Sequence, residues 1–253
     1  METARNAGSG PDRYAVIGNP IEHSQSPLMH AAFAQATGQA IAYTRLLSPL
    51  DGFAATLNSF RAGGGRGVNV TLPFKLEAFA CVQEASPRAR LTGAVNAIRF
   101  DGDRMVGENF DGVGLVRDVR VNLGQPLAGQ RILLLGAGGA ARGALLPFLA
   151  QRPAELVIAN LEDEVAGALA TLGRAHAAPG TQVHATNYRG LMGTRFDMVF
   201  NATSASLSGE LPPVPATVFS GGRLAYDLAY GQGLTPFLRL ARNAGVARIA
   251  DRV

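Results

Sequence analysis

The sequence predicts an α/β protein with two domains, a mixed α/β domain in the N-terminal half and a doubly wound parallel sheet in the C-terminal half. Short β-branched and apolar runs alternate with amphipathic segments along the chain, and from residue 131 onward strands and helices alternate strictly. We expect a disordered leader at residues 1–12, a first domain at residues 13–111 and a second at residues 112–253.

The N-terminal half contains clear signals for the starts and ends of elements. Three runs rich in β-branched and aromatic residues are predicted strands: 14–18, 40–47 and 67–73. Ser26-Pro27 predicts the cap and first-turn proline of a helix that Gly38 ends. A second helix is indicated by apolar residues at helical spacing: Leu50, Phe53, Leu57 and Phe60. Asp101-Gly102, between two short strand-like runs, predicts a hairpin.

The C-terminal half begins with a predicted helix at residues 113–122 and a loop at residues 124–129. The strands expected after it are short apolar runs: 131–135, 155–160, 181–185, 196–201 and 223–229. Their regular alternation with helical segments predicts a parallel sheet with right-handed crossovers.

The composition is that of a globular protein, with 47% apolar residues. The net charge of +4 does not indicate nucleic-acid binding, because the cations are scattered and aromatic residues make up only 7%. No apolar run reaches the roughly 18–20 residues of a membrane span, and we expect no secretory signal. Cys81 is the only cysteine, and the four histidines show no zinc-type pairing with cysteine. We therefore expect a cytoplasmic protein without a metal or an internal disulfide.

The strongest indication of a ligand is the glycine-rich turn Gly136-Ala137-Gly138-Gly139-Ala140. Glycines let the backbone approach a pyrophosphate, and the helix that follows offers free N–H groups and a positive dipole end. Because the turn directly follows a buried strand, it predicts a Rossmann-type dinucleotide-binding domain, although such turns also occur without a ligand.

Ligands of such sheets bind at the carboxyl ends of the strands. This rule nominates Asn160, residues 201–204 and residues 228–230 as further contacts. Each of them could equally cap a loop.

The first half carries many polar residues on short, otherwise apolar segments: His23-Ser24-Gln25-Ser26, Asn69, Thr71, Lys75, Asn96 and Asn109-Phe110-Asp111. Neutral donors and acceptors in such number suit a ligand covered in hydroxyl groups. The alternative is that Ser26 caps its helix and the asparagines complete turns.

Lys75 is the only lysine, since the other 22 of the 23 cationic side chains are arginine. Arginine cannot lose its proton in a protein, whereas an amine can, so proton transfer is a role that arginine cannot fill. If the fold brings Asp111 to Lys75, the carboxylate would orient the amine while the amine relays a proton to or from a ligand hydroxyl. A solvated surface lysine is the alternative.

Taken in order, a series of motifs resembles the shikimate dehydrogenase family: GNPIEHSQSP, GVNVTLPFK, GAVNA, ENFDGVGL, GAGGAARG, NATS, YDLAY and TPFL. The resemblance covers residues 14–251. It implies a substrate domain followed by a Rossmann domain. It also implies reversible hydride transfer between shikimate and 3-dehydroshikimate with NADP, or NAD as the other candidate, in chorismate and aromatic amino-acid biosynthesis.

The resemblance also implies roles for single residues. Lys75 would be the catalytic acid/base, with Asp111 beside it. The substrate contacts would be Ser24, Ser26, Thr71, Asn96, Asp111 and Tyr230. The cofactor contacts would be Gly136, Ala137, Gly138, Gly139, Ala140, Asn160, Thr203 and Leu228, the last standing where the family usually has methionine.

Three departures from the family's pattern change these expectations. NADP-using members have Asn-Arg-Thr and a further arginine where residues 160–165 read NLEDEV, so we expect weak discrimination between NADP and NAD, with Arg142 as a compensating cation. Phe110 is expected to narrow the cleft or disturb the turn before Asp111. The sequence ends at Val253, where the family continues into a helix that bears a glutamine ligand. We expect a marginal first domain, or one covered by another chain as in a homodimer.

The leading hypothesis is an NADP-dependent shikimate dehydrogenase. Two alternatives stay open: a quinate/shikimate dehydrogenase that uses NAD, and a non-catalytic ligand-binding relative.

Overall fold

A computed structural model describes residues 10–229 and 233–251. The chain forms two compact units, Met1–Asn109 and Phe110–Val253, and within the described residues each contains a six-stranded sheet. The α/β fold class predicted from the sequence is confirmed. The domain bounds at residue 111 and the ligand assigned to each domain stay predictions.

The first unit begins with a strand whose first residue, Asp12, was predicted to end the leader; residues 1–9 lie outside the described residues. In chain order the described part contains β1 (Asp12–Gly18), α1 (Ser26–Thr37), β2 (Ile41–Leu47), α2 (Phe53–Ala62), β3 (Gly65–Val70), α3 (Lys75–Cys81), β4 (Glu84–Ala85), α4 (Pro87–Thr92), β5 (Ala97–Asp101) and β6 (Arg104–Glu108).

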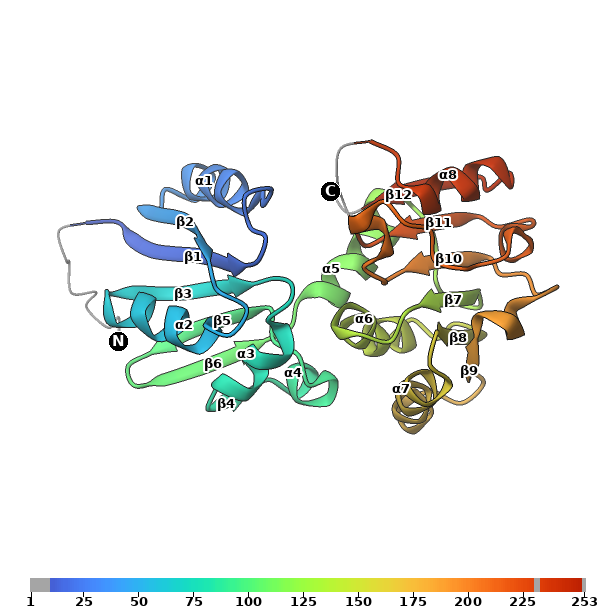
Figure 1. Cartoon of the computed structure of the whole chain (residues 1–253), viewed down its shortest axis with the longest axis horizontal. Coiled ribbons are helices and arrows are strands. Elements are labelled where there is room, and N and C mark those ends of the chain that lie inside the picture. Colours follow the sequence, from blue (N-terminus) through green and yellow to red (C-terminus); the bar gives the residue numbers. More distant parts are fainter. Residues whose placement is uncertain (1–9, 230–232, 252–253) are drawn as a thin grey trace. The chain divides into compact units, whose positions relative to one another are not determined.

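The sheet of the first unit is mixed, with the strand order β2-β1-β3-β5-β6-β4 (Figure 1). β1 runs parallel to β2 and β3, whereas β5 runs antiparallel to β3 and β6. The ends of β1, β3 and β6 and the start of β5 therefore lie at one edge, which we call the carboxyl edge of this sheet. On one face α2 buries Phe53 and Leu57, and the Phe53 ring stacks on Phe74 with centroids 5.1 Å apart.

β3 ends earlier than predicted, at Val70 instead of residue 73. Thr71 N donates to the Ile17 carbonyl oxygen at 2.9 Å, and Phe74 N donates to the Thr71 carbonyl oxygen at 3.1 Å. The chain thus turns at Thr71 and enters α3, a helix that the sequence pattern did not predict.

α1 ends where predicted, at Thr37 before Gly38, but it starts one residue earlier and has a different cap. Its first residue is Ser26, and the N-cap position belongs to Gln25. Ser26 N donates to Ser24 Oγ at 3.3 Å. The prediction that Ser26 caps the helix is therefore wrong, because Ser26 is already inside the helix and Ser24 accepts its N–H.

The second unit contains, in its described part, α5 (Asp111–Arg117), a π-helical turn (Asp118–Asn122), β7 (Arg131–Leu135), α6 (Gly139–Ala150), β8 (Glu155–Asn160), α7 (Asp163–His176), β9 (Gln182–Asn187), β10 (Met198–Asn201), β11 (Leu224–Asp227), α8 (Pro236–Asn243) and β12 (Arg248–Asp251), with 3₁₀ turns at Tyr188–Leu191, Ala205–Ser208 and Ala216–Phe219. Across the described residues of both units, every helix is too short or too polar to cross a membrane.

The sheet of the second unit is parallel throughout, with the order β12-β11-β10-β7-β8-β9 (Figure 1). The order reverses between β7 and β10, which makes the carboxyl ends of these strands the topological switch point of a Rossmann sheet. Successive residues of β7 face opposite sides of the sheet and pack into two separate cores. Ile132 packs with α6 and α7, and Leu133 packs with α8. The sheet is thus covered on both faces, as parallel sheets require.

Candidate active site

Ser24 lies between β1 and α1, at the carboxyl edge of the first sheet, and is 7% exposed. Its hydroxyl donates to Ser26 Oγ at 3.2 Å. Its carbonyl oxygen accepts hydrogen bonds from Arg45 Nε at 3.0 Å and Nη2 at 2.6 Å. Arg45, on β2, therefore fixes the backbone that carries both predicted serine contacts. No sequence pattern indicated Arg45, because a strand's period does not show which loop its side chains meet.

Tyr43, also on β2, holds the side chain of Asn69. The Tyr43 hydroxyl donates to Asn69 Oδ1 at 2.6 Å, and the ring stacks on His30 with centroids 4.1 Å apart. Burial raises the pKa of the Tyr43 phenol, which keeps the hydroxyl protonated and able to donate. Burial also lowers the pKa of His30, against the opposing effect of a hydrogen bond with Asn69. No sequence pattern indicated Tyr43 or His30 as parts of this region.

Lys75 is the first residue of α3 and is only 8% exposed, so it is not the solvated surface lysine that the sequence left open. Its carbonyl oxygen accepts from Val95 N at 2.9 Å. The neighbouring Asn96 is also buried, and its carbonyl oxygen accepts from Val70 N at 2.8 Å. Lys75, Asn96 and Thr71 therefore belong to adjoining segments of the carboxyl edge.

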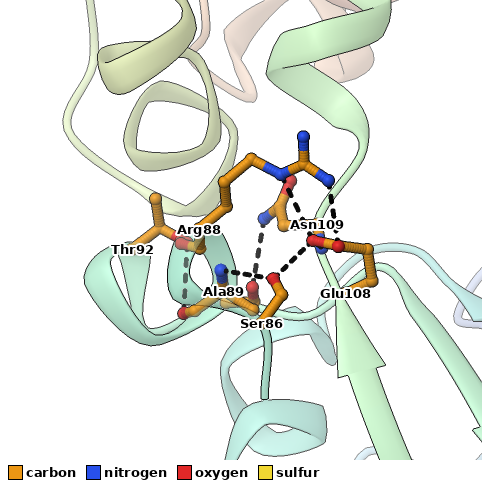
Figure 2. Close-up of polar contacts among 7 residues, drawn as sticks. Ser86, Arg88, Ala89, Thr92, Glu108 and Asn109 are labelled. Atoms are coloured by element: carbon orange, nitrogen blue, oxygen red, sulfur yellow. Dashed lines mark hydrogen bonds and ion pairs between the residues drawn. The ribbon is translucent and has the colours of Figure 1, made fainter.

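A polar network fixes the end of β6 at the same edge (Figure 2). The Glu108 carboxylate accepts hydrogen bonds from Ser86 Oγ, from Arg88 Nη2 at 2.9 Å and from Asn109 N at 2.7 Å. Asn109 Nδ2 donates to the Ala94 carbonyl oxygen at 3.1 Å. Burial raises the pKa of Glu108, but the hydrogen bonds from Arg88, Ser86 and Asn109 and the charge of Arg88 outweigh it and lower the pKa. The network holds the carboxylate charged at neutral pH.

Asp111 begins α5, the first helix of the second unit. Phe110 holds the N-cap position, and its carbonyl oxygen accepts from Gly114 N at 2.9 Å. The expected effect of this phenyl ring on the cleft or on the turn stays a prediction. A Cβ added to Gly112 would lie 2.0 Å from the Gly143 oxygen, which shows how closely α5 approaches α6. The predicted pairing of Asp111 with Lys75, and the catalytic role of both, stay predictions.

The turn after β7 presents backbone groups, instead of side chains, to a ligand. Gly136 has a φ of +94°, and a Cβ there would lie 3.1 Å from Thr203 Cγ2, so only glycine fits. Gly138 is the N-cap of α6, has no side chain to cover the first N–H groups of that helix, and a Cβ on it would meet nothing within 4 Å. These features fit a pyrophosphate lying against the N-terminus of α6.

Thr203 is held by a buried amide and a buried carboxylate. Asn201 Oδ1 accepts from Thr203 N at 3.1 Å and from its Oγ1 at 2.7 Å, and Asn201 Nδ2 donates to Asp227 Oδ1 at 3.1 Å. Asp227, fully buried, also accepts from Ser206 Oγ at 2.6 Å and Thr235 Oγ1 at 2.7 Å. Asp227 thus ties together the loops after β10 and β11, a role the sequence analysis missed.

The other predicted contacts of the second unit lie at the ends of its strands. Asn160 is the last residue of β8, and Leu228 follows β11 and packs, half-buried, on the core. The predicted substrate contact Tyr230 lies outside the described residues.

Comparison with known proteins decides the family. Residues 16–98 match a family model described as the shikimate dehydrogenase substrate binding domain. The shikimate dehydrogenase (NADP(+)) of Aromatoleum aromaticum is 54% identical over 240 residues, an alignment that covers 95% of this chain and 86% of that protein. This chain belongs to the shikimate dehydrogenase family. The resemblance stated from the motifs is therefore confirmed.

Solved structures of similar proteins agree with this family assignment. An Ael1 enzyme from Pseudomonas putida has a TM-score of 0.86 and 54% identity, covering 95% of this chain and 87% of that one. The shikimate 5-dehydrogenase of Thermus thermophilus, crystallised with NADP(H) and shikimate, has a TM-score of 0.81 and 30% identity, covering 96% of this chain and 87% of that one.

Within this shikimate dehydrogenase family member, three exposed carboxylates follow the end of β8: Glu162, Asp163 and Glu164. The last two lie in the first turn of α7, and Asp163 Oδ2 accepts from Asn187 Nδ2 at 2.9 Å. Negative charge is favourable at a helix N-terminus, so these carboxylates have a structural role there. Among the described residues, no three histidine, cysteine or acidic side chains gather into a metal site.

Proposed function

We propose that this chain is an NADP-dependent shikimate dehydrogenase, which reversibly interconverts shikimate and 3-dehydroshikimate on the route to chorismate and the aromatic amino acids. The observation that carries the proposal is the burial of the only lysine, Lys75, at a sheet edge lined by neutral polar residues. The family assignment supports it, since curated relatives about half identical to this chain carry that name.

In the proposed oxidation, Lys75 Nζ accepts the proton of the ring hydroxyl, and Asp111 holds and orients the amine. The hydride acceptor would be supplied by NADP⁺ bound to the second unit. The polar contacts to the ring acid are assigned to Ser24, Ser26, Thr71, Asn96, Asp111 and Tyr230. Because each hydroxyl can both donate and accept, this mixture of hydroxyl, amide and carboxylate groups suits a polyhydroxylated ring.

The dinucleotide is assigned to the second unit. The backbone of Gly136–Ala140 and the first turn of α6 would bind the pyrophosphate, with Asn160, Thr203 and Leu228 as further contacts. A second candidate, NAD-dependent oxidation of quinate, is favoured by one observation, the three carboxylates at residues 162–164. We further propose a cytoplasmic enzyme whose copies associate as a homodimer, a state that light scattering measures.

One assay tests both candidates. The purified chain is offered shikimate or quinate, each with NADP⁺ or NAD⁺, and formation of the reduced nicotinamide is followed by absorbance. We expect shikimate with NADP⁺ to react fastest. Faster reaction of quinate with NAD⁺ would favour the second candidate, and no reaction in all four mixtures would identify a non-catalytic ligand-binding relative.

A further inference from the structure

A groove of about 760 Å³ lies in the second unit, where β8 and β9 end side by side with Asn160 opposite Asn187. Its walls include Leu161, which follows β8, and Pro213 and Pro215, which belong to the segment after β10. The groove is therefore built from three strand ends at the carboxyl edge of the Rossmann sheet, where such sheets bind nucleotides.

The walls of the groove are mostly apolar and include one cation. Leu161 is 74% exposed and Met192 is 70% exposed, although each is a large apolar side chain. Exposed apolar side chains that gather in a groove indicate a binding surface, and apolar side chains suit contact with the face of a purine ring. The cation is Arg189, which lines the same groove.

Arg189 has a fixed backbone and an available side chain. Asn187 Oδ1 accepts from Arg189 N at 3.0 Å and from Gly190 N at 3.1 Å, which anchors the 3₁₀ turn that carries the arginine. Among the described residues, the ion pairs found do not include Arg189, and its side chain is exposed. A guanidinium in this state can bind a phosphate in bidentate geometry.

The groove also bears on how NADP could bind beside the carboxylates of residues 162–164. Three carboxylates beside the end of β8 would repel the 2′-phosphate of NADP unless a cation lies close by. In Rossmann proteins an acidic residue near this strand end binds the ribose 2′-hydroxyl of NAD, whereas an arginine accommodates the 2′-phosphate of NADP. Asn187 contacts both the acidic segment and the turn that carries the arginine. Its Nδ2 donates to Asp163 Oδ2, and its Oδ1 accepts from Arg189 N.

We propose that Arg189 binds the 2′-phosphate of NADP and is the residue that allows this chain to use NADP, with the adenine ring on Leu161 and Met192. This inference rests on the proposed function, because it assumes that a dinucleotide lies on the turn after β7. It replaces Arg142, the compensating cation expected from the sequence, by a residue that lies on the groove.

The test measures binding of fragments, so it does not depend on turnover. Adenosine 2′,5′-bisphosphate and adenosine 5′-monophosphate are titrated into the purified full chain by calorimetry. Arg189→Ala should weaken the bisphosphate about 10- to 100-fold, the loss of a charged hydrogen-bonded contact, and leave the monophosphate nearly unchanged. Arg189→Lys should recover part of the loss. Arg195→Ala, an exposed arginine outside the groove, is the matched control and should change neither titration.

A second variant locates the adenine. Leu161→Asp puts a carboxylate on the apolar wall and should weaken both fragments; unchanged binding of both would overturn the proposal. The proposal would also be overturned if Arg189→Ala weakened the binding of both fragments equally, or weakened the binding of neither. If wild type binds NADP and oxidises shikimate, while Arg189→Ala binds the bisphosphate as tightly as wild type, the proposed function stands and only the role of Arg189 fails. Both fail together if wild type binds neither dinucleotide.

Discussion

In the first unit the groups proposed to recognise the ring acid are the side chains of Ser24, Ser26, Thr71 and Asn96, and Ser24 Oγ donates a hydrogen bond to Ser26 Oγ. In the second unit the turn after β7 presents backbone, and glycine at residues 136 and 138 keeps side chains out of it. We attribute this difference to the ligands proposed for the two units. A ring with several hydroxyls needs donors and acceptors placed one by one, whereas a pyrophosphate needs a positive helix end that the backbone can reach. We therefore expect function to be most sensitive to side-chain substitutions in the first unit and to changes of backbone conformation in the second.

The largest expected effect is that of Lys75→Met, which keeps an apolar stem but removes the amine. Loss of the proton acceptor should lower kcat for shikimate oxidation about 10²- to 10⁴-fold. The proposed dinucleotide contacts lie in the other unit, so the Kd for NADP, measured by calorimetry, should not change.

Lys75→Arg is the control for charge, because it keeps a cation that cannot accept a proton at neutral pH. It should be nearly as inactive as the methionine variant. If either variant kept a tenth or more of the wild-type kcat, Lys75 would not be the acid/base. A matching loss of NADP affinity would point to a structural role instead.

The second effect compares two glycines of one turn. Gly136→Ala should lower the free energy of unfolding by about 1–3 kcal/mol, because a φ of +94° is strained for alanine and the methyl would lie 3.1 Å from Thr203 Cγ2. Gly138→Ala meets no atom within 4 Å and has a negative φ, so stability should change by less than about 0.5 kcal/mol. Its methyl would nevertheless enter the space assigned to the pyrophosphate and weaken NADP. Urea unfolding and calorimetry measure the two quantities. Unchanged NADP binding in Gly138→Ala would place the pyrophosphate elsewhere.

These contrasts also explain what could be predicted from the sequence. The turn at residues 136–140 and the strand at residues 155–160 were predicted correctly in position, because both depend on local pattern. Tyr43 and Arg45 could not be identified, since the period of a strand shows that they share a face but not which loops that face meets. Arg189 was missed for a related reason: its groove is formed by segments after three different strands, which no local spacing connects.

The smallest expected effect concerns the network at the end of β6, where side chains hold the chain in place. The folded state lowers the pKa of Glu108 relative to its ordinary value of 4.5, so the charged form is favoured by folding. The stabilisation is therefore complete at pH values above 4.5 and is lost as the pH falls through the lowered pKa. Glu108→Gln should cost roughly 1 kcal/mol at pH 7, and its unfolding free energy should fall less than that of wild type between about pH 6 and about pH 3.

Glu84→Gln is the matched control for this network. Glu84 pairs with Arg104 at the surface of the same sheet, with both side chains about half exposed, so its loss should change stability little. If Glu108→Gln lost stability with falling pH as steeply as wild type, the carboxylate would not be favoured by folding. Because Glu108 accepts from Asn109 N, the residue before the second unit, Glu108→Gln should also raise the KM for shikimate if this network positions the segment that leads to Asp111. If Glu108→Gln lowered stability but left the KM unchanged, the network would stabilise the fold of the first unit without positioning the segment that leads to Asp111.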